Sequence, residues 1–195
     1  MTPTPLNDAQ PPKVLLGVTG AIACYKVCSL VRLMVARGWQ VQVVATAHAL
    51  DFVGEITWRT LSQRAVERDA FAPNADWHPR HIALADWCDL FLVAPCSANT
   101  LAKLAHGLAD NLLTETALAL PPGKPMWVAP SMNTRMWEHA ATQANVETLR
   151  ARGAQVLLPK AGELACGVTG AGRLPEPEEL MAALAEWKGG ARNEV

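Results

Sequence analysis

The chain has 195 residues, half of them hydrophobic, and its 17 lysines and arginines nearly balance its 18 aspartates and glutamates. This length and composition are typical of one compact soluble domain, and the absence of any basic run argues against nucleic acid or an anionic membrane as a partner. No apolar run reaches the roughly 20 residues that a membrane span needs, and the polar, proline-rich N-terminus does not resemble a signal peptide, so we expect a cytoplasmic protein.

The five cysteines argue against both a disulfide framework and a structural metal. They are an odd number, scattered through a chain that we expect to be cytoplasmic, where disulfides are rare. Two of them stand four residues apart on a predicted helix, but no second Cys or His pair completes a zinc site. The cysteines are Cys24, Cys28, Cys88, Cys96 and Cys166.

Strands and helices are predicted to alternate along the chain. The first strand leads through the glycine-bearing turn TGAIA into a helix that ends at Gly38. The stretch NTLAKLAHGLADNLLTETALAL also has helical periodicity, and a last helix closes the chain. The predicted strands are KVLLGV (13–18), QVQVVAT (40–46), DLFLVAP (89–95), MWVAP (126–130) and AQVLLP (154–159), and the predicted helices cover 24–38, 99–120 and 177–187.

Uniformly apolar strands that alternate with helices predict a doubly wound α/β fold, with a parallel sheet covered on both faces. We expect a single domain over residues 13–188, with tails at 1–12 and 189–195. In such folds ligands bind beyond the carboxyl ends of the strands. The segments at that edge are TGAIA, TAHAL, APCSANT and PSMN.

The turn after the first strand is the first candidate site. Backbone amides and a helix N-terminus at GVTGAIA could face a phosphate, although such glycines could equally serve only to allow a tight turn. The pattern is not GxGxxG, and the second strand ends in Thr46 rather than in an acidic residue that would bind a ribose. These two details favour a mononucleotide over NAD.

Three further segments carry polar or reactive side chains. Ser97, Asn99 and Thr100 crowd a helix start, where a cap needs only one of them. His81 precedes a short amphipathic segment and could move protons near neutral pH, although an isolated histidine is more often structural. The composition of residues 162–177, around Cys166, predicts a mobile loop that is either an ordinary surface loop or a lid carrying a thiol.

Five segments, taken in order from about Lys13 to Pro177, resemble the flavin-dependent cysteine decarboxylase family. The resemblance implies FMN as cofactor, a flavodoxin-like or Rossmann-like three-layer sandwich, and homotrimers with the flavin at a subunit contact, sometimes assembled into homododecamers. The segments are GVTGAIACYK, HIALADW, PCSANTLAKLAHGLADNLL, PSMNTRMW and LACGVTGAGRLPEP.

The same resemblance implies roles for individual residues. His81 matches the catalytic base of the family, Cys166 its proton donor and Asn133 its ligand for the substrate carboxylate. Met132, Glu163, Ala165 and Leu174 fall in the remaining substrate-binding positions. The implied FMN contacts are Gly20, Ala21, Ile22, Thr46, Ala49, Leu50, Ser97, Ala98, Asn99, Thr100 and Ser131.

The implied reaction explains why a flavin is needed. Loss of CO2 from a cysteine leaves electron density on Cα that the unmodified residue cannot delocalise. Hydride transfer from Cβ to the flavin would create a thioaldehyde able to accept that density, and Cys166 would later donate a proton while hydride returns. The expected substrate is 4'-phosphopantothenoylcysteine, a precursor of coenzyme A, because ACGVTGAGRLPEP is close to that type.

Several alternatives remain open at this point. Leu174 and Ser131 stand where methionine and alanine are common in the family, which leaves a peptidyl cysteine as an alternative substrate. A flavin prenyltransferase and a non-catalytic flavin-binding regulatory subunit are the other candidates. Because the chain is too short to include a ligase domain, we expect the pathway's phosphopantothenate–cysteine ligase to be a separate protein.

Overall fold

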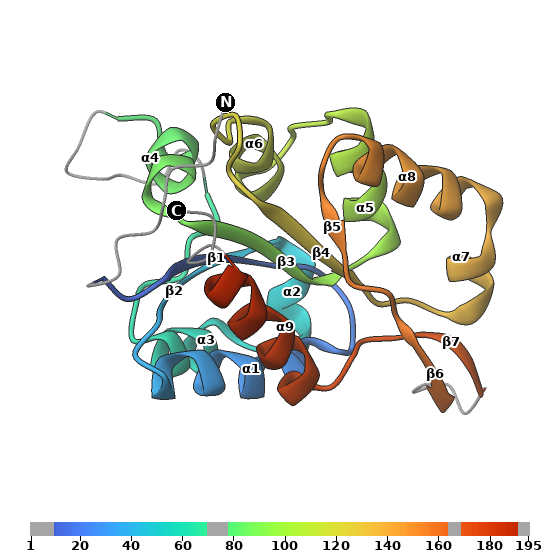
Figure 1. Ribbon diagram of the computed structural model, residues 1–195, viewed down its shortest axis with the longest axis horizontal. Helices are drawn as coiled ribbons and strands as arrows, with labels where there is room; N and C mark the ends of the chain where they lie inside the picture. The colour runs from blue at the N-terminus through green and yellow to red at the C-terminus, as the bar shows by residue number, and fades with distance from the viewer. Residues whose placement is uncertain (1–9, 70–77, 164–168, 191–195) are drawn as a thin grey trace.

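Five parallel strands form a central sheet in the order β2-β1-β3-β4-β5 (Figure 1). The computed structural model describes residues 10–69, 78–163 and 169–190. The strands are β1 (Lys13–Val18), β2 (Gln40–Ala45), β3 (Leu90–Cys96), β4 (Met126–Pro130) and β5 (Gln155–Val156). This order and direction are those of the flavodoxin-like fold, so the fold prediction is confirmed.

Helices cover both faces of the sheet, which gives the three layers seen in Figure 1. Short helices α2 (Ala47–Phe52) and α7 (Thr134–Glu138) lie at the carboxyl-end edge. One face carries α1 (Cys24–Ala36), α3 (Glu55–Ser62) and α9 (Pro177–Gly190), and the other carries α4 (Arg80–Trp87), α5 (Ala98–His106), α6 (Leu112–Leu118) and α8 (Ala140–Ala151).

Alternation of side chains along each strand divides the interior into two cores. On β1, Leu16 packs toward α1 and α9, whereas its neighbour Leu15 packs toward α5 and α6. On β3, Leu92 and Phe91 divide in the same way, and all four side chains are fully buried. Because a parallel sheet is buried on both faces, its strands are apolar throughout, as the sequence predicted.

The structure corrects two predicted elements. The helical stretch over 99–120 is two helices, because Gly107 adopts a left-handed conformation (φ 69°) at the end of α5. A capping box of Asn111 and Thr114 then starts α6. The strand predicted over 154–159 pairs only over Gln155–Val156.

The segment predicted as a mobile loop is ordered on both flanks. Strands β6 (Lys160–Glu163) and β7 (Thr169–Arg173) pair antiparallel and form a hairpin that projects beside α7 (Figure 1). The loop prediction is therefore wrong for these flanks, while residues 164–168 between them lie outside the described residues. The sequence did not predict this hairpin, because its strands contain repeated glycines and glycine is depleted in strands.

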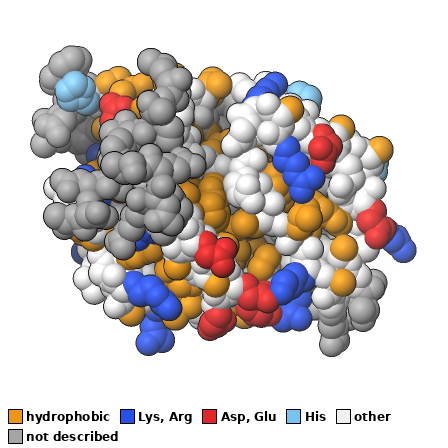
Figure 2. Space-filling view, in the orientation of Figure 1, with side chains coloured by type: hydrophobic (Ala, Val, Ile, Leu, Met, Phe, Trp, Pro, Cys, Tyr) orange, Lys and Arg blue, Asp and Glu red, His pale blue; other side chains and the backbone are white. Residues whose placement is uncertain are grey.

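The surface shows no single-sign face in the view of Figure 2, where acidic and basic side chains are interspersed. None of the helices in the described part of the chain is long and apolar enough to cross a membrane. The predicted domain boundaries at residues 13 and 188 stay predictions. Pro12, which precedes β1, is buried and its carbonyl accepts a bond from the Gln40 amide at 2.9 Å.

Candidate functional site

A buried threonine joins the ends of β1 and β3, the two strands between which the chain order reverses. The Thr19 hydroxyl donates to the Pro95 carbonyl at 2.7 Å and accepts from the Ser97 amide at 2.8 Å. Thr19 has no exposed surface. The loops that follow β1 and β3 are thereby held side by side at the switch point, where ligands of open α/β sheets bind.

The loop between β1 and α1 contains the predicted phosphate contacts Gly20, Ala21 and Ile22. A Cβ added at Gly20 would lie 2.7 Å from Cβ of His48, so only glycine lets this loop approach α2 so closely. The thirteen-residue α1 begins without a side-chain cap and without an acidic residue in its first turn. Its positive N-terminal end therefore has no counter-charge from its own first turn, which suits a phosphate.

The three predicted contacts on the β2 side occupy different environments. Thr46 follows β2, and its amide and hydroxyl both donate to the Val18 carbonyl. Ala49 is fully buried in α2, while Leu50 is half-buried and packs on the core. Thr46 and Leu50 thus keep some surface at the carboxyl-end edge, and Ala49 keeps none.

The polar side chains between β3 and α5 have different roles. Ser97 caps α5, since its hydroxyl accepts from the Thr100 amide at 3.3 Å. Thr100 is buried against this cap, whereas Asn99 is exposed and Ala98 is half-buried. One serine therefore satisfies the cap, and Asn99 is the polar side chain that this segment presents to solvent.

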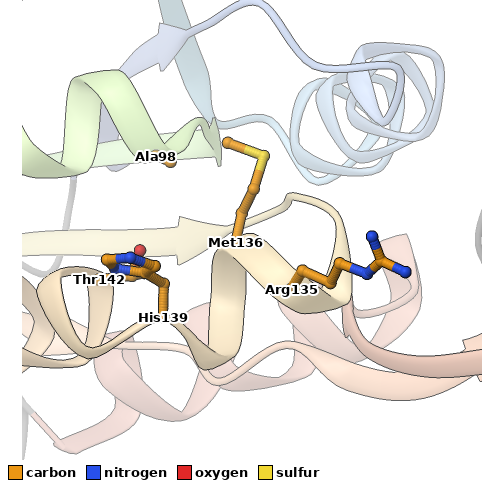
Figure 3. A pocket seen from close by; sticks show the side chains of 5 residues that line it. All are labelled: Ala98, Arg135, Met136, His139 and Thr142. Atoms are coloured by element: carbon orange, nitrogen blue, oxygen red, sulfur yellow. The ribbon is translucent and has the colours of Figure 1, made fainter.

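An open pocket of about 360 Å³ lies between the start of α5 and helices α7 and α8. Figure 3 shows the Met136 side chain reaching toward Ala98, while Arg135 points away from it. The Met136 side chain is 49% exposed. The lining residues are Ala98, Arg135, Met136, His139 and Thr142.

The segment after β4 is fixed by its backbone. The Ser131 amide donates to the Cys96 carbonyl at 3.0 Å, and Ser131 is buried. Asn133 caps α7 by accepting from the Arg135 amide at 2.9 Å. This bond uses Oδ1 of Asn133, and the hydrogen-bond donors of the exposed side chain are on Nδ2.

The same segment is docked on the hairpin. The half-buried Met132 donates its amide hydrogen to the Gly172 carbonyl at 3.0 Å. Gly172 has φ 130°, and a Cβ there would lie 2.2 Å from the Met132 carbonyl oxygen. Gly170 similarly leaves no room for a Cβ beside Thr134. The glycines of β7 are therefore what allows the hairpin to lie against the segment that carries Asn133.

His81 lies in the first turn of α4, apart from the residues that line the pocket. It is half-buried, and its Nδ1 atom faces Oε2 of Glu115 at 3.7 Å. His81 faces α6 at one end of the molecule, whereas Asn133 starts α7 at the opposite end (Figure 1). Within one chain, the predicted base and the predicted carboxylate ligand thus belong to separate clusters.

Other predicted residues are placed away from the edge or not described. Leu174 is buried in the core beside α9, with 1% of its surface exposed. Cys166 and Ala165 lie outside the described residues, and of Glu163 only the backbone is described. Sequence reasoning missed Thr19, Glu115 and His139. The one sequence signal for Glu115 was its position as an acidic residue in the first turn of a helix.

The described cysteines are ordinary core thiols. Burial raises the pKa of Cys24, Cys28 and Cys88 from 9.0 to about 11. Burial also raises the pKa of Cys96, which is fully enclosed. All four are therefore protonated at neutral pH and poorly suited to act as nucleophiles.

Residues 3–189 match the family model described as Flavoprotein. The chain belongs to the flavoprotein family. This flavoprotein is 42% identical over 174 residues to the probable phosphopantothenoylcysteine decarboxylase of Streptococcus mutans, a match that covers 89% of this chain and 97% of that protein. It is 44% identical over 168 residues to the coenzyme A biosynthesis bifunctional protein CoaBC of Bacillus subtilis, covering 86% of this chain. It spans only 41% of the length of that CoaBC protein.

Solved structures agree with the fold. A PPC decarboxylase variant complexed with pantothenoylaminoethenethiol superposes with a TM-score of 0.82 at 32% identity, over 91% of this chain and 98% of that one. The FMN-binding protein AtHal3 also gives 0.82 at 32% identity, over 91% and 97% of the two chains. The flavodoxin-like arrangement of this flavoprotein is therefore shared with proteins of this group.

Proposed function

We propose that this flavoprotein binds FMN and decarboxylates 4'-phosphopantothenoylcysteine to 4'-phosphopantetheine, a step of coenzyme A biosynthesis. The observation that carries the proposal is the meeting of the loops after β1, β3 and β4 at one edge of the sheet, beside an open pocket and Asn133. The near full-length similarity to the Streptococcus mutans protein supports the choice of substrate.

The residues at this edge fit FMN. The uncapped start of α1 and the small residues Gly20 and Ala21 suit its phosphate, and Asn99 offers a polar contact nearby on the next loop. Met136 and Ala98 offer apolar surface of the kind that a planar ring covers. Bound FMN would supply the reversible acceptance of hydride from the substrate Cβ that makes loss of CO2 possible.

The side chains of the protein would bind, orient and exchange protons. Asn133 would orient the carboxylate with neutral N–H donors, without the full charge pairing that would stabilise the ground state. Met136 would keep water away from the reacting carbon. His81 would accept a proton as the thiol is activated, and Cys166 would return one to the product.

We include a homotrimer in the proposal, because His81 and Asn133 do not meet within one chain. A second copy could bring the α4–α6 cluster of one subunit to the α7 edge of another. Exposed large apolar side chains near the flavin loops support such a contact. They are Ile22, Tyr25 and Phe52, with 54%, 60% and 48% of their surfaces exposed. Assembly into a homododecamer, the cytoplasmic location and a separate ligase stay predictions.

Turnover tests the proposal directly. The purified protein, reconstituted with FMN, is incubated with 4'-phosphopantothenoylcysteine and, in parallel, with a peptide that ends in cysteine. Mass spectrometry should show loss of CO2 from the first and little from the second, and His81→Asn should abolish it. Reaction of the peptide alone would reassign the substrate to a peptidyl cysteine. If the protein binds FMN but forms neither product, the proposed decarboxylase activity is wrong and a regulatory flavin-binding subunit becomes the favoured function.

A further inference from the structure

A buried carboxylate oxygen without a hydrogen-bond partner faces His81. Oε2 of Glu115 is shielded from solvent, and among the described residues it has no hydrogen-bond partner. The imidazole of His81 lies beside it, with its Nδ1 atom 3.7 Å from this oxygen. Both side chains are largely enclosed, with 32% of His81 and 24% of Glu115 exposed.

The backbone fixes where Glu115 stands. Its amide donates to the Asn111 carbonyl at 2.9 Å in the first turn of α6, and the reciprocal bonds between Asn111 and Thr114 lock that turn. Helices α4 and α6 pack against each other, which places the His81 ring beside the carboxylate. The pair is thus set by two helix starts rather than by two flexible loops.

The neighbouring cation is engaged elsewhere. Arg80, next to His81 in the chain, pairs through its guanidinium with the carboxylate of Glu67. An enclosed carboxylate oxygen that lacks a donor costs free energy, so a donor that can reach it is strongly favoured. A distance of 3.7 Å exceeds a hydrogen bond, but a small rotation of either side chain closes it.

We propose that Glu115 is a positioning residue that accepts a hydrogen bond from Nδ1–H of His81 and so presents the unprotonated Nε2 to the substrate. A neutral imidazole carries its hydrogen on one nitrogen only, and the bond made by that nitrogen decides which one is left to accept a proton. The inference rests on the proposed function, in which His81 accepts a proton from the substrate. It adds the group that keeps the base in the correct tautomer.

Glu55 offers a matched control. It too is a half-buried glutamate in the first turn of a helix, where it pairs with Arg68 at 3.4 Å on the other side of the sheet. Glu115→Leu removes the acceptor, Glu115→Gln keeps a neutral acceptor of the same shape, and Glu55→Leu removes an equivalent carboxylate away from His81.

The tautomer of His81 is the first readout, and it requires no turnover. In the FMN-loaded protein with nitrogen-labelled histidine, long-range proton–nitrogen NMR at a pH where the ring is neutral should show His81 protonated on Nδ1. The signal is assigned by its loss in His81→Asn. Glu115→Leu should shift His81 toward the Nε2–H form, while Glu115→Gln and Glu55→Leu should leave it unchanged. An Nε2–H form in the unmodified protein overturns the proposal, whether or not Glu115→Leu folds.

Pre-steady-state kinetics supply the second readout. Under anaerobic conditions, Glu115→Leu should slow the bleaching of bound flavin by substrate about 10- to 100-fold, the range known for carboxylates that orient metal-bound histidines. The substrate Kd should change less than about twofold, and Glu115→Gln should restore most of the rate. An unchanged bleaching rate in Glu115→Leu overturns the positioning role. If the unmodified protein shows the Nδ1–H form but no bleaching, the proposed function fails and the hydrogen bond stands.

Discussion

The central sheet and the β6–β7 hairpin are stabilised by opposite means. Fully buried apolar side chains on both faces hold the sheet, as with Leu15 and Leu16. The hairpin instead docks through places where a side chain is missing, at Gly170 and Gly172, and through exposed ion pairs such as Lys160 with Glu179. The stability of the central sheet therefore depends on side-chain volume, whereas the docking of the hairpin depends on close approach of two backbones.

Removing volume from the sheet should have the largest effect. Phe91 is fully buried in β3, so Phe91→Ala leaves a cavity and should lower the free energy of unfolding by about 3–5 kcal/mol. Urea denaturation measures the change. Ile56→Ala is the control, because Ile56 is 77% exposed, and it should stay within about 0.5 kcal/mol. Equal losses in both variants would contradict the division between sheet and surface.

Adding a side chain to the hairpin should cost nearly as much free energy as Phe91→Ala, but only in the local opening of the hairpin. The Cβ of Gly172→Ala would meet the Met132 carbonyl, and undocking of β7 should expose the Met132 amide to exchange about 100-fold faster, or about 3 kcal/mol. Hydrogen exchange and decarboxylase turnover should both respond, while the urea midpoint should hardly move.

Gly123→Ala separates this contact from backbone strain. Gly123 also has positive φ, at 83°, but a Cβ there meets nothing within 4 Å. It should therefore show only the conformational cost of about 1–2 kcal/mol, with turnover kept. Loss of activity in Gly123→Ala, or full activity in Gly172→Ala, would show that close approach at β7 is not what the site requires.

Alkaline pH should lower the stability of the buried core. Burial holds the pKa of Cys24 and Cys88 at about 11 in the folded protein, against 9.0 without burial. The unfolded chain therefore releases these protons first, so stability is fully present below pH 9 and declines as pH rises toward 11. Urea midpoints under reducing conditions should fall across this window and fall less in Cys88→Ala. A flat profile would contradict the burial of these thiols.

The smallest effect is expected at the ion pair between α1 and the segment that joins β7 to α9. Lys26 donates to Glu176 at 2.9 Å, and Glu176 also pairs with Arg173. Because Glu176 is 43% exposed and keeps a second cation, Lys26→Met should cost less than about 1 kcal/mol in urea denaturation. Arg150→Met, which breaks an exposed pair on α8, is the control. A loss above about 2 kcal/mol would show that this ion pair is central to holding the segment of Glu176 against α1.

The sequence predicted what depends on burial and missed what depends on contacts across the fold. Apolar runs identified β1 and β4 over their full length and β3 within a residue, because those strands are enclosed on both faces. The hairpin was not predicted, because the need for glycine at Gly172 arises only from its contact with Met132, forty residues away in the chain. Glu115 and Thr19 escaped for the same reason, because their meaning comes from His81 and Ser97 on other elements.

The bonds of the Thr19 hydroxyl would limit how closely a ligand approaches the ends of β1 and β3. Its hydrogen is committed to the Pro95 carbonyl and one lone pair to the Ser97 amide, which closes the floor between β1 and β3. A ligand bound at this edge would therefore lie beyond the strand ends, because the Thr19 hydroxyl already bridges the ends of β1 and β3.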